Sequence, residues 1–281
     1  MIEQDQPGRT TDVRVRAFDG AAESTTFDTV VTEEPLELRL LFGARVHSLA
    51  VTMRTPGNDF ELAAGFIAGE QLIAGCDDLA GITYCVDADV DVQQRYNIVN
   101  VALTSAEIPA LERFERHFTM NSSCGVCGRA QLETLEARGL TPVADDARIS
   151  IQTVYAMPDR MREAQRVFST TGGLHAAALF DLAGEPVAVR EDVGRHNAVD
   201  KLTGWALLEG RSLQGTVLFV SGRTSYEIVQ KAAVARVPVV CAVSAPSSLA
   251  VALAERFNIT LLGFVRGGRA NVYTNAQRIT A

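Results

Sequence analysis

The sequence predicts an α/β protein, and two observations carry this prediction. After residue 145, strand-like apolar runs alternate with helix-like segments, which is the pattern of βαβ crossovers and of a largely parallel sheet covered on both faces. The chain of 281 residues is 47% hydrophobic and 21% charged, the balance of an ordinary soluble globular protein with a sizeable core. We expect the main sheet in residues 146–281 and a smaller α+β region before it.

The part of the chain before the main sheet is expected to divide into two segments. Residues 1–30 are polar and weakly patterned, so we expect a loose tail there. Residues 31–145 should form the smaller α+β region, in which a turn over residues 55–59 leads into a helix capped by Asn58 or Asp59. The elements predicted for this region are strands 36–41, 45–53, 82–86 and 96–103, a helix over 60–72, and a helix over 129–138 behind a loop with two cysteines.

Strands and helices alternate along residues 146–281. Pro158 suits the first turn of a helix, and Leu-Ala-Gly-Glu at residues 182–185 separates two strands as in a hairpin. The predicted helices cover 151–156, 158–168, 196–208, 225–236 and 247–257, and the predicted strands cover 175–181, 186–190, 216–220, 237–243 and 260–265.

Composition restricts the kinds of partner that the protein is expected to bind and the cellular compartment in which it is expected to work. The formal net charge of −8 disfavours broad binding to nucleic acid. Five cysteines are an odd and scattered set, which is typical of a reducing compartment. No basic and apolar leader opens the chain, and no apolar run approaches the roughly 20 residues of a membrane span. We therefore expect a cytoplasmic protein with no nucleic-acid or membrane partner.

The most informative motif is Asn-Ser-Ser-Cys-Gly-Val-Cys-Gly at residues 121–128. Cys124 and Cys127 lie among turn-forming residues, in front of a predicted helix whose N–H groups favour a thiolate. The pair has four interpretations: half of a zinc site, a thioredoxin-like dithiol, two packed cysteines, or a sulfur carrier.

The first three interpretations fit less well than the fourth. Zinc needs two further ligands, and no second CxxC or HxxxH completes a site. A thioredoxin motif should follow a strand early in a βαβ unit, which residues 115–121 do not provide. The flanking glycines and serines disfavour the interpretation as packed cysteines, and they would make a carrier thiol mobile. Since further zinc ligands are also lacking, we expect no metal site. The scattered candidate zinc ligands are Cys76, Cys85, His117, His175 and His196.

Polar loops recur after the C-terminal strands, where open α/β sheets bind ligands. The segments 190–197, 221–225, 244–248 and 266–269 combine small turn residues with, in most cases, arginine. Helix N-termini behind such loops offer N–H groups to anions, so we expect a ligand with more than one phosphate. Because neither a P-loop nor a GxGxxG pattern occurs, an NTPase or an NAD enzyme is disfavoured.

Together these motifs resemble those of the FdhD/NarQ family from about residue 34 onward. Residues 55–66, Thr-Pro-Gly-Asn-Asp-Phe-Glu-Leu-Ala-Ala-Gly-Phe, are similar to the family's N-terminal helix entry. The other matching motifs are Cys-Gly-Val-Cys-Gly at 124–128, Thr-Gly-Gly-Leu-His-Ala-Ala at 171–177, Glu-Asp-Val-Gly-Arg-His-Asn-Ala-Val-Asp-Lys at 191–201, Ser-Gly-Arg-Thr-Ser-Tyr-Glu at 221–227 and Gly-Phe-Val-Arg-Gly-Gly-Arg-Ala-Asn-Val-Tyr-Thr at 263–274.

The resemblance implies a sulfur carrier, a sulfurtransferase that active formate dehydrogenase requires. Members take persulfide sulfur from a cysteine desulfurase and pass it to the molybdenum-bis(molybdopterin guanine dinucleotide) cofactor. The resemblance places the persulfide on Cys124, with Cys127 assisting, and implies a homodimer. It also implies a cytidine-deaminase-like three-layer fold for residues 146–281. The family's cofactor-binding segment matches Phe264, Val265, Arg266, Gly267, Gly268 and Arg269.

Further cofactor contacts are expected from residue type. Arg195 and Arg223 should join Arg266 and Arg269 at the diphosphates, because guanidinium groups pair bidentately with phosphate. His196 lies in the same loops, and Asp192 or Asn197 is expected to read a guanine edge.

Two other functions compete with that of a sulfur carrier. A zinc deaminase is disfavoured because the cysteines precede His175 and the glutamate that the reaction needs is missing. The alternative is a non-catalytic molybdenum-cofactor-binding chaperone with a structural or redox CxxC.

Overall fold

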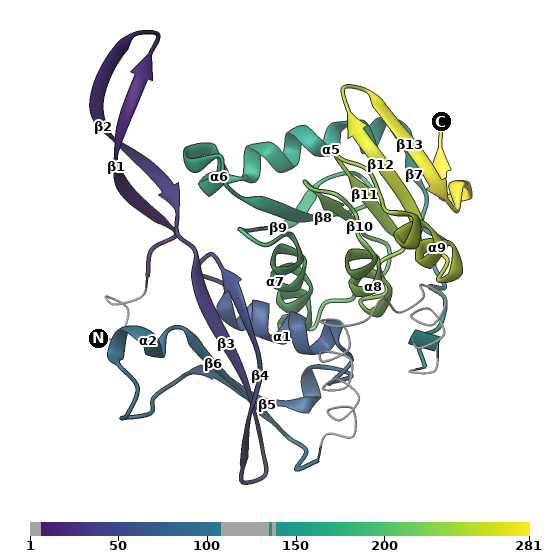
Figure 1. Cartoon of the computed structure of the whole chain (residues 1–281). Coiled ribbons are helices and arrows are strands. Elements are labelled where there is room, and N and C mark those ends of the chain that lie inside the picture. The colour runs from purple at the N-terminus through teal and green to yellow at the C-terminus, as the bar shows by residue number, and fades with distance from the viewer. Residues whose placement is uncertain (1–6, 108–134, 137–138) are drawn as a thin grey trace.

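The computed structural model describes residues 7–107, 135–136 and 139–281 of the chain. Within these residues the protein is a mixed α/β structure with four sheets, of which the largest have four and six strands. Figure 1 shows the two large sheets with helices packed between and around them. The two-cysteine loop lies outside the described residues, as does most of the helix predicted over 129–138.

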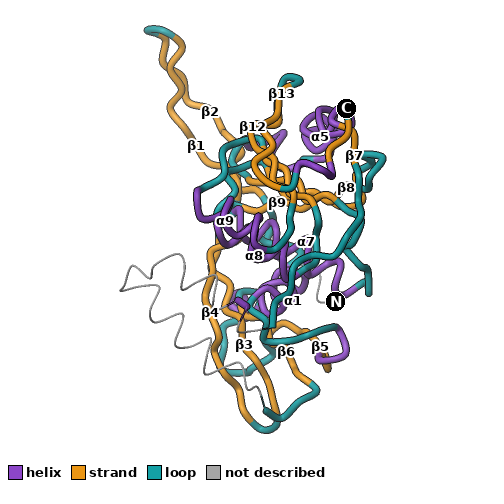
Figure 2. Tube along the Cα trace, turned by 90° about the vertical axis from the view of Figure 1, so that its right-hand side faces the viewer, coloured by secondary structure: helices purple, strands orange, loops and turns teal. Residues whose placement is uncertain are grey.

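An antiparallel hairpin precedes the two large sheets. β1 (Thr10–Asp19) pairs with β2 (Ala22–Val31) along its whole length. Figures 1 and 2 both show this hairpin projecting away from the rest of the chain. The expectation of a loose tail over residues 1–30 is therefore wrong for this segment. Its pattern is weak because a two-stranded ribbon faces no core.

The four-stranded sheet and helix α1 form the α+β region. Its strand order is β4-β3-β6-β5, and alternate leucines of β3 pack with Leu62 and Ile67 of α1 in one core. The short helices η1 (Cys76–Asp78) and α2 (Val92–Arg95) lie in its connections. The main elements are β3 (Glu34–Phe42), β4 (Arg45–Arg54), α1 (Asp59–Gly69), β5 (Leu79–Tyr84) and β6 (Ile98–Leu103).

Helices α5 (Ile151–Ala164) and α6 (Arg166–Thr171) follow, with their boundary later than predicted. Ser150 caps α5 by accepting a hydrogen bond from the Thr153 amide at 3.0 Å. Pro158 lies inside α5, so its predicted place at the start of a second helix is wrong. The helical axis instead breaks at Gln165. A small sheet pairs β7 (Ile149–Ser150) with β14 (Ile279–Thr280), next to η2 (Ala276–Arg278).

The six-stranded sheet is mixed, and the prediction of a largely parallel sheet is wrong. Its order is β13-β12-β11-β10-β8-β9, in which β10, β11 and β12 pair in parallel and the other pairs are antiparallel. The predicted β8–β9 hairpin is confirmed, whereas β13 was not predicted. The strands are β8 (His175–Phe180), β9 (Pro186–Asp192), β10 (Val217–Val220), β11 (Val239–Ala242), β12 (Thr260–Arg266) and β13 (Arg269–Thr274).

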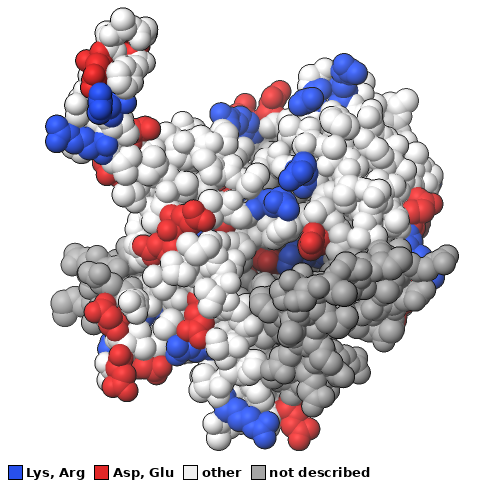
Figure 3. Space-filling model, in the orientation of Figure 1, with Lys and Arg blue, Asp and Glu red and all other residues white. Residues whose placement is uncertain are grey.

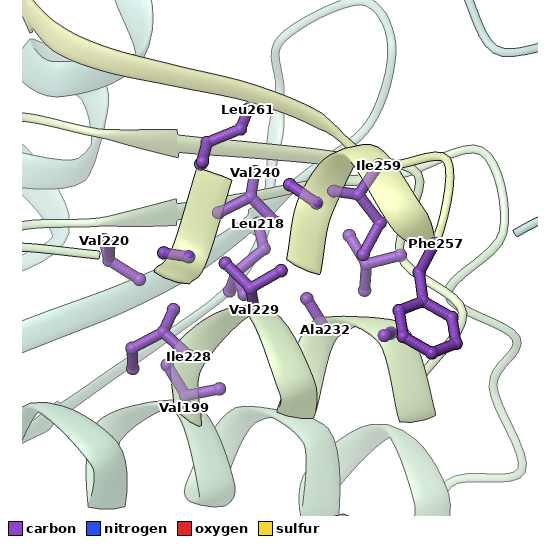
Figure 4. Close-up of a cluster of buried hydrophobic side chains, with 14 of the residues drawn as sticks. Val199, Leu218, Val220, Ile228, Val229, Ala232, Val240, Phe257, Ile259 and Leu261 are labelled. Atoms are coloured by element: carbon purple, nitrogen blue, oxygen red, sulfur yellow. The ribbon is translucent and has the colours of Figure 1, made fainter. Parts of the chain in front are cut away.

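Helices cover both faces of this sheet. On one face, α7 (Arg195–Leu208), α8 (Tyr226–Val234) and α9 (Ser248–Arg256) enclose the core in Figure 4, where Val229 of α8 meets Leu218 and Val240 of the sheet. On the other face, α5 covers Phe180 and Phe219. Burial on both faces explains the continuous apolar runs of β10 and β11. Across the described residues, every helix is too short or too polar to cross a bilayer.

Two glycines bring helix α1 against helix α7. A Cβ atom at Gly65 would lie 1.9 Å from the Asp200 carbonyl oxygen, and one at Gly204 would lie 1.8 Å from the Glu61 carbonyl oxygen. The two backbones therefore touch. Arg190 of β9 adds a bidentate ion pair to the Glu61 carboxylate, with Nη2 at 2.8 Å from Oε1. These contacts fix the N-terminal region against the helix that begins at the edge of the larger sheet.

Substitution of Gly65 by alanine should destabilise the protein. The new methyl group meets backbone atoms that cannot rotate away, and overpacking of this kind costs about 1–3 kcal/mol or more. Urea unfolding checks the expectation. The control is Gly75→Ala, where a Cβ meets nothing within 4 Å and little change is expected. Equal midpoints for the two variants would contradict the close approach.

Candidate functional site

The polar strand ends gather at one edge of the six-stranded sheet. β9, β10, β11 and β12 run in the same direction and end there, while β8 and β13 run oppositely and begin there. Helices α7, α8 and α9 start from the same edge. The predicted convergence of the strand-end loops is therefore confirmed. Figure 3 shows Lys and Arg side chains (blue) near the centre of this view, with acidic side chains beside them.

Asp192, the last residue of β9, is the hub of a buried network. It is 0% exposed, and its carboxylate pairs with Lys201 Nζ at 2.7 Å. The same carboxylate accepts hydrogen bonds from the Thr55 amide at 3.1 Å, the Gly194 amide at 2.8 Å and Asn197 Nδ2 at 3.0 Å. The network ties the start of α7 to the turn between β4 and α1.

The expectation that Asp192 or Asn197 reads a guanine edge is corrected by this network. The Asn197 amide also donates to the Met53 carbonyl at 2.7 Å, and its oxygen lies 3.3 Å from Thr52 Oγ1. Because both side chains use their hydrogen-bonding groups within the protein, neither offers a free edge to a ligand. They instead shape the loop at the start of α7.

Two polar atoms at the edge have no partner. The Nε of Arg195 and the Oγ1 of Thr224 are both buried without a hydrogen bond to the described residues. Gly222 packs closely against two of the side chains at this edge: a Cβ there would lie 3.3 Å from His175 Nδ1 and 3.9 Å from Arg195 Cδ. A buried polar atom without a partner is costly, so these two atoms are the ones at this edge with unused hydrogen-bonding capacity among the described residues. Arg223 is exposed in the same loop.

The positive charge of this edge comes from arginine, not from histidine. Burial, followed by the nearby Arg195 charge, lowers the pKa of His196 to about 4. His196 Nε2 lies 3.1 Å from Ser225 Oγ and 3.7 Å from Glu227 Oε2. Burial and Arg195 also lower the pKa of His175. Both imidazoles therefore favour the neutral form near pH 7, and arginine supplies the positive charge at this edge.

The turn between β12 and β13 presents two arginines to solvent. Gly267 and Gly268 occupy it with φ of 56° and 68°, a region that glycine adopts without strain. Arg266 and Arg269 are exposed on either side and face each other in the strand register. No described hydrogen bond or ion pair joins them to the loops before α7 and α8.

Of the remaining residues in this segment, only one can offer its side chain. Val265 is fully buried in the core under α5, so within the predicted cofactor-binding segment its side chain faces the protein interior. Phe264 is half-buried and has a left-handed φ of 55°, which is unusual for a bulky side chain. Its amide donates to the Ser244 carbonyl at 3.1 Å and so holds the β11 loop beside β12.

Cys124 and Cys127 lie outside the described residues. Of the described cysteines, Cys85 and Cys241 are buried and Cys76 is exposed. Burial raises the pKa of the Cys241 thiol, which makes it inert at neutral pH. No three His, Cys, Asp or Glu side chains within the described ranges come together to hold a metal ion.

A cavity of about 490 Å³ lies beside this edge, on the α5 side of the sheet, and was not predicted from the sequence. Gln165 and Phe168 line it together with His175 and Ser221. The helical lining residues belong to no recognisable motif, so only their spatial neighbours reveal them. Sequence reasoning also missed that Glu191 caps α6. The sequence offered one indication of this cap, which is the position of Glu191 in the run of ionisable residues before α7.

Three comparisons place this chain among known proteins. The model of the FdhD/NarQ family matches residues 31–280. A Streptomyces coelicolor protein named "Sulfur carrier protein FdhD" is 51% identical over 278 residues, covering 97% of this chain and 96% of that protein. A Mycobacterium tuberculosis protein of the same name is 47% identical over 272 residues, covering 95% and 97%.

The fold is also that of a solved structure. A crystal structure titled as a putative formate dehydrogenase accessory protein from Desulfotalea psychrophila superposes with a TM-score of 0.74 at 23% identity, covering 96% of this chain and 99% of that one. The sequence match over most of the chain goes further than the fold, and it shows that the protein belongs to the FdhD/NarQ family.

Proposed function

We propose that this protein is a sulfur carrier that serves formate dehydrogenase. The observation that carries the proposal is the match of nearly the whole chain, at about half identity, to relatives named sulfur carrier proteins. The donor is a cysteine desulfurase and the acceptor is the molybdenum-bis(molybdopterin guanine dinucleotide) cofactor, before its insertion into the enzyme. The proposal includes a cytoplasmic homodimer and a cytidine-deaminase-like fold for residues 146–281.

Sulfur loading is a thiol exchange at Cys124. The Cys124 thiolate attacks the outer sulfur of the donor's persulfide, a new S–S bond forms, and the donor cysteine leaves as a thiolate. Cys127 supplies a balanced way to release the sulfur. Its thiolate attacks the inner sulfur of the Cys124 persulfide, which gives a Cys124–Cys127 disulfide and expels hydrosulfide for the acceptor. A cellular dithiol then reduces the disulfide.

The sheet edge has the chemistry to hold the acceptor. Arg195 Nε and Thr224 Oγ1 have no hydrogen-bond partner among the described residues, and Arg223, Arg266 and Arg269 are exposed where strands of the same sheet end or begin. Guanidinium groups and helix N-termini suit the diphosphates of a guanine dinucleotide. Because both nearby histidines are neutral, the binding charge should persist above pH 7.

Restoration of formate dehydrogenase activity tests this proposal. Cell extract that lacks this protein should contain inactive formate dehydrogenase, and adding the purified protein with a cysteine desulfurase and cysteine should restore formate oxidation. Omitting cysteine is the control and should prevent restoration. Full restoration without any sulfur source would contradict a carrier role.

A further inference from the structure

A second cavity lies where the C-terminal ends of α1, α7 and α8 meet, and we call it the helix-end cavity. It has a volume of about 240 Å³. Its lining comes from the last turns of the three helices and from the loops at residues 73–74, 211–214 and 235–236. Because α7 and α8 begin at the edge of the six-stranded sheet, the helix-end cavity lies at the opposite end of these helices.

The walls of the helix-end cavity are mostly apolar. Ala68 of α1, Ala206 and Leu207 of α7 and Val234 of α8 all contribute to them. The cavity is smaller than the roughly 300–1,000 Å³ of pockets that hold drug-sized ligands. These walls therefore suit a compact apolar group, such as a single ring, and not a whole nucleotide.

Three cations and no carboxylate line this cavity. The cations are Arg211, Lys231 and Arg236. Lys231 is 7% exposed, and its Nζ pairs with an Asp200 carboxylate oxygen at 2.7 Å. The Arg236 guanidinium donates to the carbonyl oxygens of residues 141 and 142 at 2.6 and 2.9 Å. Two of the three cations therefore have partners within the protein.

Arg211 is the cation that remains available. It is exposed, and its backbone amide donates to the Ala206 carbonyl at 2.8 Å, which fixes its place directly after α7. Its guanidinium lies 5.2 Å from the centroid of the Trp205 ring, and no hydrogen bond or ion pair joins that guanidinium to the described residues. A guanidinium beside a ring keeps its in-plane N–H donors free for a ligand.

We propose that the helix-end cavity binds a small monocarboxylate with an apolar body, with that body against the alanine and leucine walls and the carboxylate on Arg211. Charge complementarity supports this class of ligand, because no acidic side chain in the lining would repel an anion. A guanidinium also pairs with a carboxylate through two parallel hydrogen bonds. The inference goes beyond the proposed function, because no proposed step of the sulfur transfer uses this end of the helices.

Titration calorimetry of the full-length protein with benzoate, benzamide and acetate tests the proposal. Benzamide has the shape of benzoate without its charge, and acetate has the charge without the ring. We expect the wild type to bind benzoate about tenfold or more tightly than either analogue, because only benzoate uses both the guanidinium and the apolar walls.

Two variants separate the guanidinium from the apolar walls. Arg211→Gln removes the charge and should weaken benzoate binding by about tenfold or more, with little effect on benzamide. Ala68→Leu places a larger side chain in the cavity and should weaken the binding of both. Arg45→Gln is the matched control, because Arg45 is an exposed arginine of β4 outside the lining, and it should bind benzoate like the wild type.

The unfolding midpoint of each variant is compared with that of the wild type, and the exposed position of Arg211 lets Arg211→Gln decide if Ala68→Leu does not fold. GDP, a probe for the guanine nucleotide of the proposed acceptor, should bind all of these variants alike, because the sheet edge lies at the other end of α7 and α8. Absence of benzoate binding to the wild type, equal affinity for benzoate and either analogue, or unchanged benzoate affinity in Arg211→Gln would overturn the proposal. An equal loss in Arg45→Gln would do the same.

Discussion

Replacing Cys124 with alanine should abolish formate dehydrogenase activation and leave GDP binding unchanged. The substitution removes the sulfur atom that accepts the persulfide in the proposed mechanism, and Cys127 is expected only to release that sulfur. The proposed binding groups, among them Arg195 and Thr224, belong to other elements. Activation is measured as formate oxidation after reconstitution, and binding is measured by calorimetry.

Two further cysteine variants sharpen this expectation. Cys76→Ala removes an exposed thiol outside the motif and should keep full activation. Cys127→Ala should still load sulfur on Cys124 but release it slowly, so the persulfide should accumulate. Full activation by Cys124→Ala would contradict the carrier mechanism and support a chaperone that only binds the cofactor.

Replacing Lys201 with methionine should strongly destabilise the folded protein. Lys201 is 1% exposed and neutralises Asp192, which is 0% exposed, through an ion pair at 2.7 Å. Burial lowers the pKa of Lys201, and the Asp192 charge opposes that shift. Removing one partner leaves a buried charge without compensation, which costs about 3–5 kcal/mol. Urea unfolding at pH 7 measures the difference in free energy.

The matched control for this variant is Arg256→Met. Arg256 pairs with Glu136 in a comparable ion pair, with Nη2 at 3.0 Å from Oε2, but both side chains are well exposed. Exposed pairs contribute about 0–1 kcal/mol, so the control should unfold close to wild type. If both variants lose the same free energy of unfolding, the buried pair of Asp192 and Lys201 does not stabilise the fold as described above.

The order of elements from β8 to α9, the β8–β9 hairpin and the parallel run from β10 to β12 could be predicted from the sequence, but the antiparallel placement of β8 beside β10 could not. β10 and β11 are buried on both faces, and such strands read alike in parallel and antiparallel sheets. The directions depend on which strands become neighbours, and β8 pairs with both β9 and β10. β13 was missed because most of its side chains are exposed and carry no apolar alternation.

The residue types at the site were predictable, whereas their burial was not. Glycine, serine and arginine after successive strands correctly indicated a shared polar edge. The burial of Asp192 could not be predicted from the sequence, because its partners Thr55 and Lys201 contact it only when α1 packs on α7.

The central claim is that Cys124 carries transferable sulfur, and peptide mass spectrometry tests it most directly. The purified protein is incubated with a cysteine desulfurase and cysteine, thiols are blocked, and the peptide that contains Cys124 and Cys127 is sequenced. We expect the mass of one additional sulfur on Cys124, present in Cys127→Ala and absent in Cys124→Ala. Sulfur on another cysteine, or on none, would contradict the account.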